Sequence, residues 1–194
     1  MSKGLLIETH LFEAKLQQEE NGTYLVKGIL QRAGAPNQNN RRYPKEILER
    51  ECQKYQQLIK ERRALGELDH PESSVVNLQN VSHNITEMAF NGDDLIGTVE
   101  ILTTPSGNIL RELFKNGIKL GISSRGMGSV SPVNENGAQE VGDDFELIAF
   151  DFVSNPSTHG AFLHPMNESV DNNSPVRDGK YGKVESVIND ILRG

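Results

Sequence analysis

The hydrophobic pattern of the first third of the chain changes from a period of two to a helical period. Apolar and β-branched residues dominate 5–8 and 23–31, and the turn signal Glu20-Asn21-Gly22 lies between the two runs. This pattern predicts an opening pair of strands. After Pro44, apolar residues recur at helical spacing as far as Arg63, and they predict a helix with proline in its first turn.

The rest of the ordered pattern is mostly typical of strands. Residues 75–90 and 94–102, divided by the turn Asn91-Gly92-Asp93, predict a long β-hairpin. A short helix is expected over residues 108–116. Two more strands are expected in the apolar runs 118–130 and 145–153.

The length of 194 residues favours one domain with a sizeable core. Toward the C-terminus the composition becomes polar and rich in Pro, Asn and Gly. We therefore expect a domain over residues 1–165, followed by a polar connector and a C-terminal helix over residues 166–194 that form a mobile tail.

Charge and composition disfavour several classes of protein. Lys and Arg total 20 against 27 Asp and Glu, a net charge of −7, so a nucleic-acid surface is not expected. The single cysteine, Cys52, excludes a disulfide framework or a cysteine-based zinc site within one chain and fits a reducing cytosol. Neither a long apolar run nor a leader pattern is present, which indicates a protein that is not secreted and does not span a membrane.

The first candidate for chemistry is His70, which lies in the block Gly-Glu-Leu-Asp-His-Pro and is followed by Pro71. Proline restricts the backbone of the residue before it. His70 is interpreted either as an ordinary loop histidine or as a metal ligand with Glu67 and Asp69. The metal interpretation is weak, because side chains two apart on an extended chain share a face and supply only two ligands.

The second candidate is the serine pair Ser123-Ser124 in a glycine-rich run, and the third is Asp151 in an apolar run. Arg125 stands where a nucleophile elbow requires glycine, so an α/β-hydrolase is excluded; a glycine-rich strand with exposed hydroxyls is the simpler interpretation. The carboxylate of Asp151 either points to solvent or is buried, and burial requires a partner. A His, a Ser and an Asp together are the residue types of a nucleophile, a base and an orienting acid.

Five short blocks along the chain carry a resemblance to a known family: residues 6–9 (LIET), 40–49 (NRRYPKEILE), 64–71 (ALGELDHP), 121–129 (GISSRGMGS) and 151–157 (DFVSNPS). The sequences of these blocks and their order resemble those of the myovirus-type bacteriophage prohead core proteases, and the resemblance covers residues 5–165. The resemblance implies an α+β fold, an assemblin-like and mostly antiparallel β-barrel flanked by helices. It further implies a serine endopeptidase without a cofactor, acting inside the assembling prohead in the host cytoplasm. The implied substrates are scaffolding core proteins and the major capsid protein; a homo-oligomer is also implied.

Carried over position by position, the resemblance makes His70 the catalytic histidine, Ser123 the nucleophile and Asp151 the third member. Ser124 competes with Ser123, because adjacent strand residues face opposite sides and only one of them reaches the histidine. Related assemblins have a histidine as third member, for which His83 and His159 are the alternatives here.

The resemblance also implies cleavage after glutamate in Leu/Ile-x-Glu sequences. Two such glutamates near the N-terminus, Glu8 and Glu13, are candidates for autocleavage. A pocket for a glutamate side chain needs cations or donors, and the candidates are Arg41, Arg42, Lys119 and Arg125. Backbone amides of the glycine-rich run around Gly126, together with Arg125, are candidates for the oxyanion hole.

Two other functions compete with the protease. The first is a catalytically silent capsid or scaffold interaction protein with the same fold. The second is a metal-dependent hydrolase that uses His70, Asp69 and either His159 or His164.

Overall fold

The computed structural model describes residues 3–12, 16–19, 22–69, 71, 73–133 and 137–154. The expected connector and C-terminal helix over residues 166–194 lie outside the described residues. Among the described residues, no helix is both long and apolar enough to cross a membrane.

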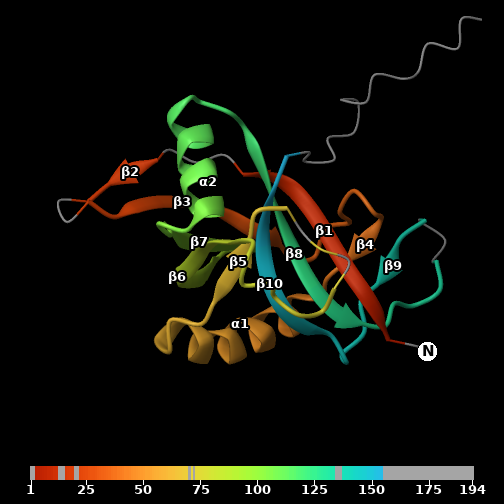
Figure 1. The fold of residues 1–194 in the computed structure, drawn as a ribbon. Helices are drawn as coiled ribbons and strands as arrows, with labels where there is room; N and C mark the ends of the chain where they lie inside the picture. Colours follow the sequence, from red (N-terminus) through yellow and green to blue (C-terminus); the bar gives the residue numbers. More distant parts are fainter. Residues whose placement is uncertain are drawn as a thin grey trace, which may run out of the picture. The chain divides into compact units, whose positions relative to one another are not determined.

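A three-stranded antiparallel sheet holds the two glycine- and phenylalanine-rich segments of the sequence side by side. It consists of β1 (Gly4–Phe12), β8 (Leu120–Gly128) and β10 (Glu146–Val153) in the order β1-β8-β10. The central strand β8 is buried along almost its whole length, because a strand lies on each side of it (Figure 1). The strands expected over residues 118–130 and 145–153 are thereby confirmed with trimmed ends.

A second, five-stranded sheet contains the predicted hairpin. Its order is β2 (Gln17–Gln18), β3 (Tyr24–Arg32), β7 (Asp94–Ile101), β6 (Val81–Asn91) and β5 (Leu65–Glu67). The hairpin β6–β7 is confirmed, but β6 begins at Val81 rather than at Val75. Val75 and Leu78 are 71% and 73% exposed, so the apolar pattern before Val81 belongs to a surface segment.

The predicted opening strand pair is wrong in its pairing. Both strands exist, but β1 pairs with β8 and β3 pairs with β7. The two strands meet through their faces instead of their edges: a Cβ atom on Gly28 of β3 would lie 2.7 Å from the ring of Phe12 of β1. Phe12 of β1 and the β3 residues Val26 and Leu30 thereby belong to one hydrophobic core cluster.

The described sheets do not close into a barrel. Each sheet has an open strand order, and an isolated parallel bridge between Leu68 and Phe152 links the end of β5 to β10. A small parallel pair, β4 (Arg41–Arg42) with β9 (Gln139–Glu140), lies apart from both sheets. The architecture is therefore α+β and mostly antiparallel, and the closed barrel is not among the described elements.

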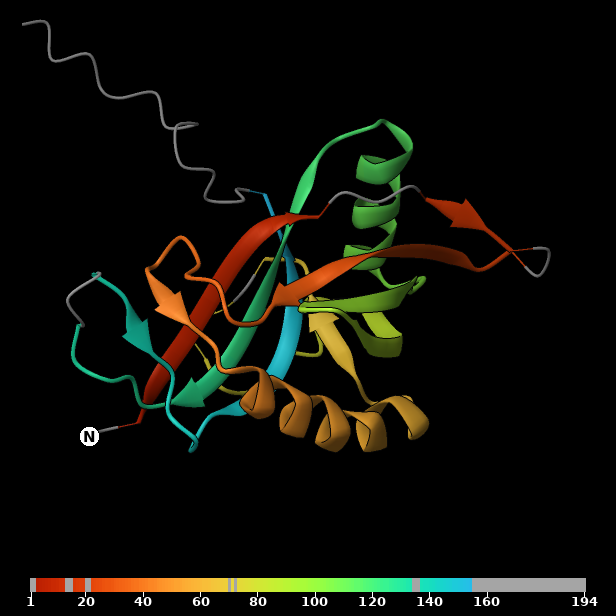
Figure 2. The same cartoon turned by 180° about the vertical axis from the view of Figure 1, so that it is seen from behind.

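Two helices cover the sheets (Figure 2). Helix α1 (Lys45–Lys60) confirms the expected helix, although Pro44 is its N-cap rather than part of its first turn, and its buried side chains include Leu48 and Tyr55. Helix α2 (Pro105–Lys115) begins three residues earlier than expected, because Thr104 caps it by accepting a hydrogen bond from the amide of Gly107. Helix α1 packs on β6 and β10, whereas α2 packs on β6 and β7.

Candidate functional site

Ser123 and Asp151 lie directly opposite each other on β8 and β10. Directly opposed residues of an antiparallel pair project from the same face of the sheet, with Cβ atoms about 5 Å apart. Arg125, two residues after Ser123, also projects from this face. Ser123, Arg125 and Asp151 therefore share one face, although they come from separate sequence blocks.

Ser124 projects from the opposite face. Its neighbours across the ladder are Glu8 on β1 and Phe150 on β10. Both serine hydroxyls are buried, and neither Oγ atom has a hydrogen-bond partner among the described residues. Of the two, Ser123 is the serine that shares a face with Asp151.

The guanidinium of Arg125 is fully buried, and all of its N–H groups donate hydrogen bonds. Nε donates to Asp151 Oδ2 at 2.9 Å, and Nη2 donates to Asp151 Oδ1 at 3.1 Å and to Glu67 Oε1 at 2.9 Å. Nη1 donates to the carbonyls of Ser73 at 2.7 Å and Val75 at 3.4 Å. Since arginine has five N–H groups, none is left for an oxyanion or for the side chain of a substrate.

Asp151 is buried with partners, as a carboxylate in an apolar run requires. Its carboxylate accepts two hydrogen bonds from Arg125, and its Oδ1 accepts a third from the backbone amide of Glu67 at 3.0 Å. Desolvation raises the pKa of Asp151, and the positive charge of Arg125 acts in the opposite direction. A carboxylate has about four acceptor positions, so Asp151 Oδ2 keeps one for a further donor.

Glu67 is a member of this cluster that the sequence suggested only as a metal ligand. Its side chain is fully buried; Oε1 accepts from Arg125 and from the amide of Asn77 at 3.0 Å. Oε2 is buried without a partner among the described residues. The available signal was its position as the sole charge in the apolar strand β5.

His70 lies outside the described residues, as do His159, His164 and Glu13. The residues just before His70 are fixed on β10: Leu68 bridges Phe152, and the amide of Asp69 donates to the Phe152 carbonyl at 2.8 Å. Phe152 is the immediate chain neighbour of Asp151. The chain is thus anchored beside the Ser123 face one residue before His70.

His83 is a satisfied core histidine in β6. Its Nε2 lies 2.9 Å from the Phe150 carbonyl, and its Nδ1 lies 2.8 Å from Ser82 Oγ. Because a carbonyl only accepts, Nε2 carries the proton and Nδ1 accepts from the serine hydroxyl. Burial lowers the pKa of His83 to about 4, so the ring is neutral at pH 7.

The Ser123 face is closed in this structure. Ser123 has no exposed surface. The segment 73–77 is held on the same face by Arg125, through Ser73 and Val75, and by Glu67, through Asn77. In this structure the Ser123 hydroxyl is therefore not accessible from solvent.

The remaining candidate residues are placed as follows. Arg41 is bound to the carboxylate of Glu8, Nη1 to Oε1 at 2.9 Å, and this carboxylate also accepts from Asn37, Asn39 and Tyr43. Glu8 is 3% exposed and lies inside β1, so its peptide bond is not presented for cleavage in the folded chain.

Arg42 and Lys119 keep exposed side chains. Gly126 lies in the central strand between Leu6 and Leu147, and a Cβ atom there would overlap the ring of Phe145 at 2.4 Å. Its backbone amide is directed at a neighbouring strand, as the hydrogen-bond pattern of a β-sheet requires. Within the described part of the chain, His, Cys, Asp and Glu residues form no cluster of three that would hold a metal ion.

Comparison with known proteins gives a consistent result. Residues 3–172 match the model of the family described as prohead core protein serine protease. The chain is 33% identical over 144 residues to the prohead core protein protease of Enterobacteria phage T4, covering 72% of this chain and 68% of that protein. It also matches the structure of the bacteriophage T4 capsid assembly protease, gp21, with a TM-score of 0.76 and 29% identity, over 80% of this chain and 100% of the other.

Proposed function

Because the chain belongs to the prohead core protein serine protease family, we propose that this protease uses Ser123 as its nucleophile, His70 as its general base and Asp151 as the group that orients the histidine. The observation that carries the proposal is the register of β8 and β10, which puts Ser123 and Asp151 opposite each other on one face. The anchoring of Asp69 to Phe152 supports His70 as the base, since it fixes the preceding residue beside this face.

The chemistry follows from these roles. His70 takes the proton of Ser123 as the hydroxyl attacks the scissile carbonyl, and it later returns the proton to the leaving amine. Two carboxylates share one guanidinium in the cluster of Glu67, Arg125 and Asp151, which leaves one negative charge in excess. An imidazolium formed next to the cluster would be stabilised by this charge.

The substrates we propose are the scaffolding core proteins and the major capsid protein, cleaved after glutamate in Leu/Ile-x-Glu sequences inside the assembling prohead in the host cytoplasm. Arg42 and Lys119 are our candidates for the glutamate pocket, because Arg41 and Arg125 are already bound to internal carboxylates. Autoprocessing is proposed at Glu13, since cleavage after Glu8 requires β1 to leave its sheet. An assemblin-like fold is proposed on the resemblance, and the bridge between Leu68 and Phe152, which joins the two open sheets, supports it.

The test is intact-mass analysis of the full chain incubated with a peptide that contains Leu-Phe-Glu-Ala. Wild type and Ser124→Ala are expected to cleave after the glutamate, and Ser123→Ala is expected to lose at least about a thousandfold in rate. Ser124 is the matched control, because it is an equally buried neighbour on the other face. If Ser123→Ala cleaves the peptide as fast as Ser124→Ala does, the assignment of Ser123 as the nucleophile is overturned. Loss of cleavage in the presence of a chelator would favour the metal-dependent hydrolase.

A second function has one observation in its favour. Ser123 is completely buried, which is expected of a catalytically silent capsid or scaffold interaction protein that keeps the fold. The same experiment separates the two functions. Absence of cleavage by the wild type, also in the presence of assembled substrate proteins, supports the silent protein.

A further inference from the structure

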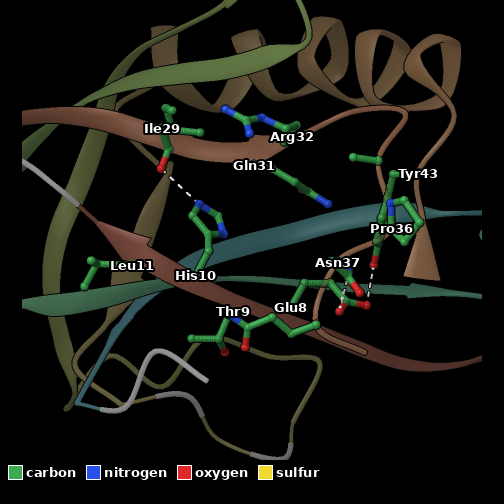
Figure 3. A pocket seen from close by; sticks show the side chains of 12 residues that line it. Glu8, Thr9, His10, Leu11, Ile29, Gln31, Arg32, Pro36, Asn37 and Tyr43 are labelled. Atoms are coloured by element: carbon green, nitrogen blue, oxygen red, sulfur yellow. Dashed lines mark hydrogen bonds between the residues drawn. The ribbon is translucent and has the colours of Figure 1, made fainter. Parts of the chain in front are cut away.

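A pocket lies where the two sheets face each other without pairing. β1 is the outer strand of the three-stranded sheet, and β3 belongs to the other sheet. They are joined by a hydrogen bond from His10 Nε2 to the Ile29 carbonyl at 3.0 Å (Figure 3). Beside this bond lies a pocket of about 340 Å³, lined by β1, β3 and the segment before β4. We refer to it as the β1–β3 groove.

Gln31 supplies an unmatched amide to the groove. The residue is 4% exposed, yet neither Nε2 nor Oε1 has a hydrogen-bond partner among the described residues. Figure 3 shows the side chain extending from β3 into the space between the two strands. The register of β3 shifts between Ile29 and Gln31, and such a bulge re-aims a side chain. A buried amide without partners is costly, so a ligand that pairs with it would be favoured.

The edge of β1 supplies backbone groups to the same groove. The Ile7 carbonyl accepts from Asn39 Nδ2 at 3.0 Å and is therefore directed away from β8. Backbone groups of alternate residues in an antiparallel strand point to the same side. The N–H and C=O groups of Thr9 and Leu11, both of which line the groove, are thus directed away from β8, on the outer edge of β1.

The groove offers no uncompensated charge. The carboxylate of Glu8 is bound by Arg41, Asn37, Asn39 and Tyr43, and Arg32 is bound to Asp94. His10 donates from Nε2 to a carbonyl, so its Nδ1 is an acceptor. The groups that face the groove are therefore neutral donors and acceptors, which is the chemistry of a peptide backbone.

We propose that the β1–β3 groove binds an extended, uncharged segment of the protein substrate, which pairs with the edge of β1 at Thr9 and Leu11 and with the carboxamide of Gln31. One peptide group of the segment accepts from Gln31 Nε2 while another donates to Oε1. Strand addition to a free sheet edge is an established mode of peptide recognition. The inference rests on the proposed protease function, since it identifies the occupant as substrate.

Two capped peptides test the proposal on the full chain. One contains Leu-Phe-Glu-Ala, and the other carries the same sequence with an N-terminal extension of alternating Thr and Gln. In wild type the extension is expected to lower KM by at least about tenfold, because the two neutral hydrogen bonds to Gln31 alone would have that effect. In Gln31→Leu the ratio of KM for the short peptide to KM for the extended peptide should fall by about tenfold, because only the pairing with the edge of β1 remains. Gln53→Leu, an exposed glutamine of α1, is the matched control and should keep the wild-type ratio.

Binding is measured independently of cleavage in the Ser123→Ala chain. Titration with the extended peptide should shift the side-chain ¹⁵N resonance of Gln31, identified by its absence in Gln31→Leu. An extension effect that is as large in Gln31→Leu as in wild type, or a Gln31 resonance that does not move, overturns the groove and leaves the protease intact. If neither peptide is cleaved by wild type but the resonance shifts, the protease function fails and the groove stands as a peptide site.

Discussion

Arg125 holds Asp151 with two hydrogen bonds, Nε to Oδ2 at 2.9 Å and Nη2 to Oδ1 at 3.1 Å, and neither side chain is exposed. The same guanidinium also binds Glu67 and the segment at Ser73. A single arginine thus fixes β5, β8, β10 and the segment that lies over the Ser123 face. Its role is to neutralise and position carboxylates.

Replacing Arg125 by Met is expected to destabilise the fold by about 3–5 kcal/mol, because two buried carboxylates lose their counter-ion. Urea unfolding of the purified variant measures the loss. The matched control is Arg32→Met: Arg32 is 59% exposed in its pair with Asp94, so the loss should stay within about 1 kcal/mol. Equal losses in the two variants would contradict the buried-cluster interpretation.

His83 is expected to make the fold less stable in acid. Its pKa is about 4 in the folded chain against 6.5 when exposed, so the unfolded chain binds more protons between these values. The contribution of the neutral His83 to the free energy of unfolding is therefore fully present above about pH 6.5. It is lost as the pH decreases toward 4, by about 3 kcal/mol in total. Urea midpoints measured from pH 7 to 4.5 should show this slope, and His83→Gln should flatten it. Burial lowers the pKa of His10 as well, so His10→Gln is the control that separates the two contributions.

Gly66 is expected to tolerate no side chain. A Cβ atom there would lie 2.0 Å from the Phe150 carbonyl and 2.3 Å from His83 Nε2, two groups that are hydrogen-bonded to each other. Gly66→Ala should lower the free energy of unfolding by about 3 kcal/mol or more. Gly4→Ala adds the same methyl group to a strand position with nothing within 4 Å and should change stability by less than about 0.5 kcal/mol. Thermal unfolding of both variants provides the comparison, and a stable Gly66→Ala chain would refute the packing described.

Two buried tyrosines make a matched pair. The hydroxyl of Tyr43 donates to Glu8 Oε1 at 2.9 Å, whereas that of Tyr55 has no partner among the described residues. Tyr43→Phe should cost about 1.5–3 kcal/mol, because a hydrogen bond to a charged group is lost. Tyr55→Phe should be neutral or stabilising. Burial raises the pKa of both phenols, so neither ionises in the neutral range where urea unfolding is measured.

The sequence predicted most elements because their signals are local. Pro44 at the start of α1 and the turn at Gly92 act through consecutive residues, and both predictions are confirmed. The pairing of β1 was predicted wrongly, because the turn signal at Gly22 belongs to the pairing of the short strand β2 with β3, whereas β1 pairs with the distant strand β8.

The sequence by itself determined the protein's family, since blocks such as GISSRG and GELDHP are properties of neighbouring residues. Only the tertiary structure decided that Asp151 faces Ser123 rather than Ser124, and that Arg125 is enclosed by Glu67 and Asp151. These relations depend on strand register and on the need of buried charges for partners. Glu67 and Arg125 are 58 residues apart in the chain, and no local pattern encodes their contact.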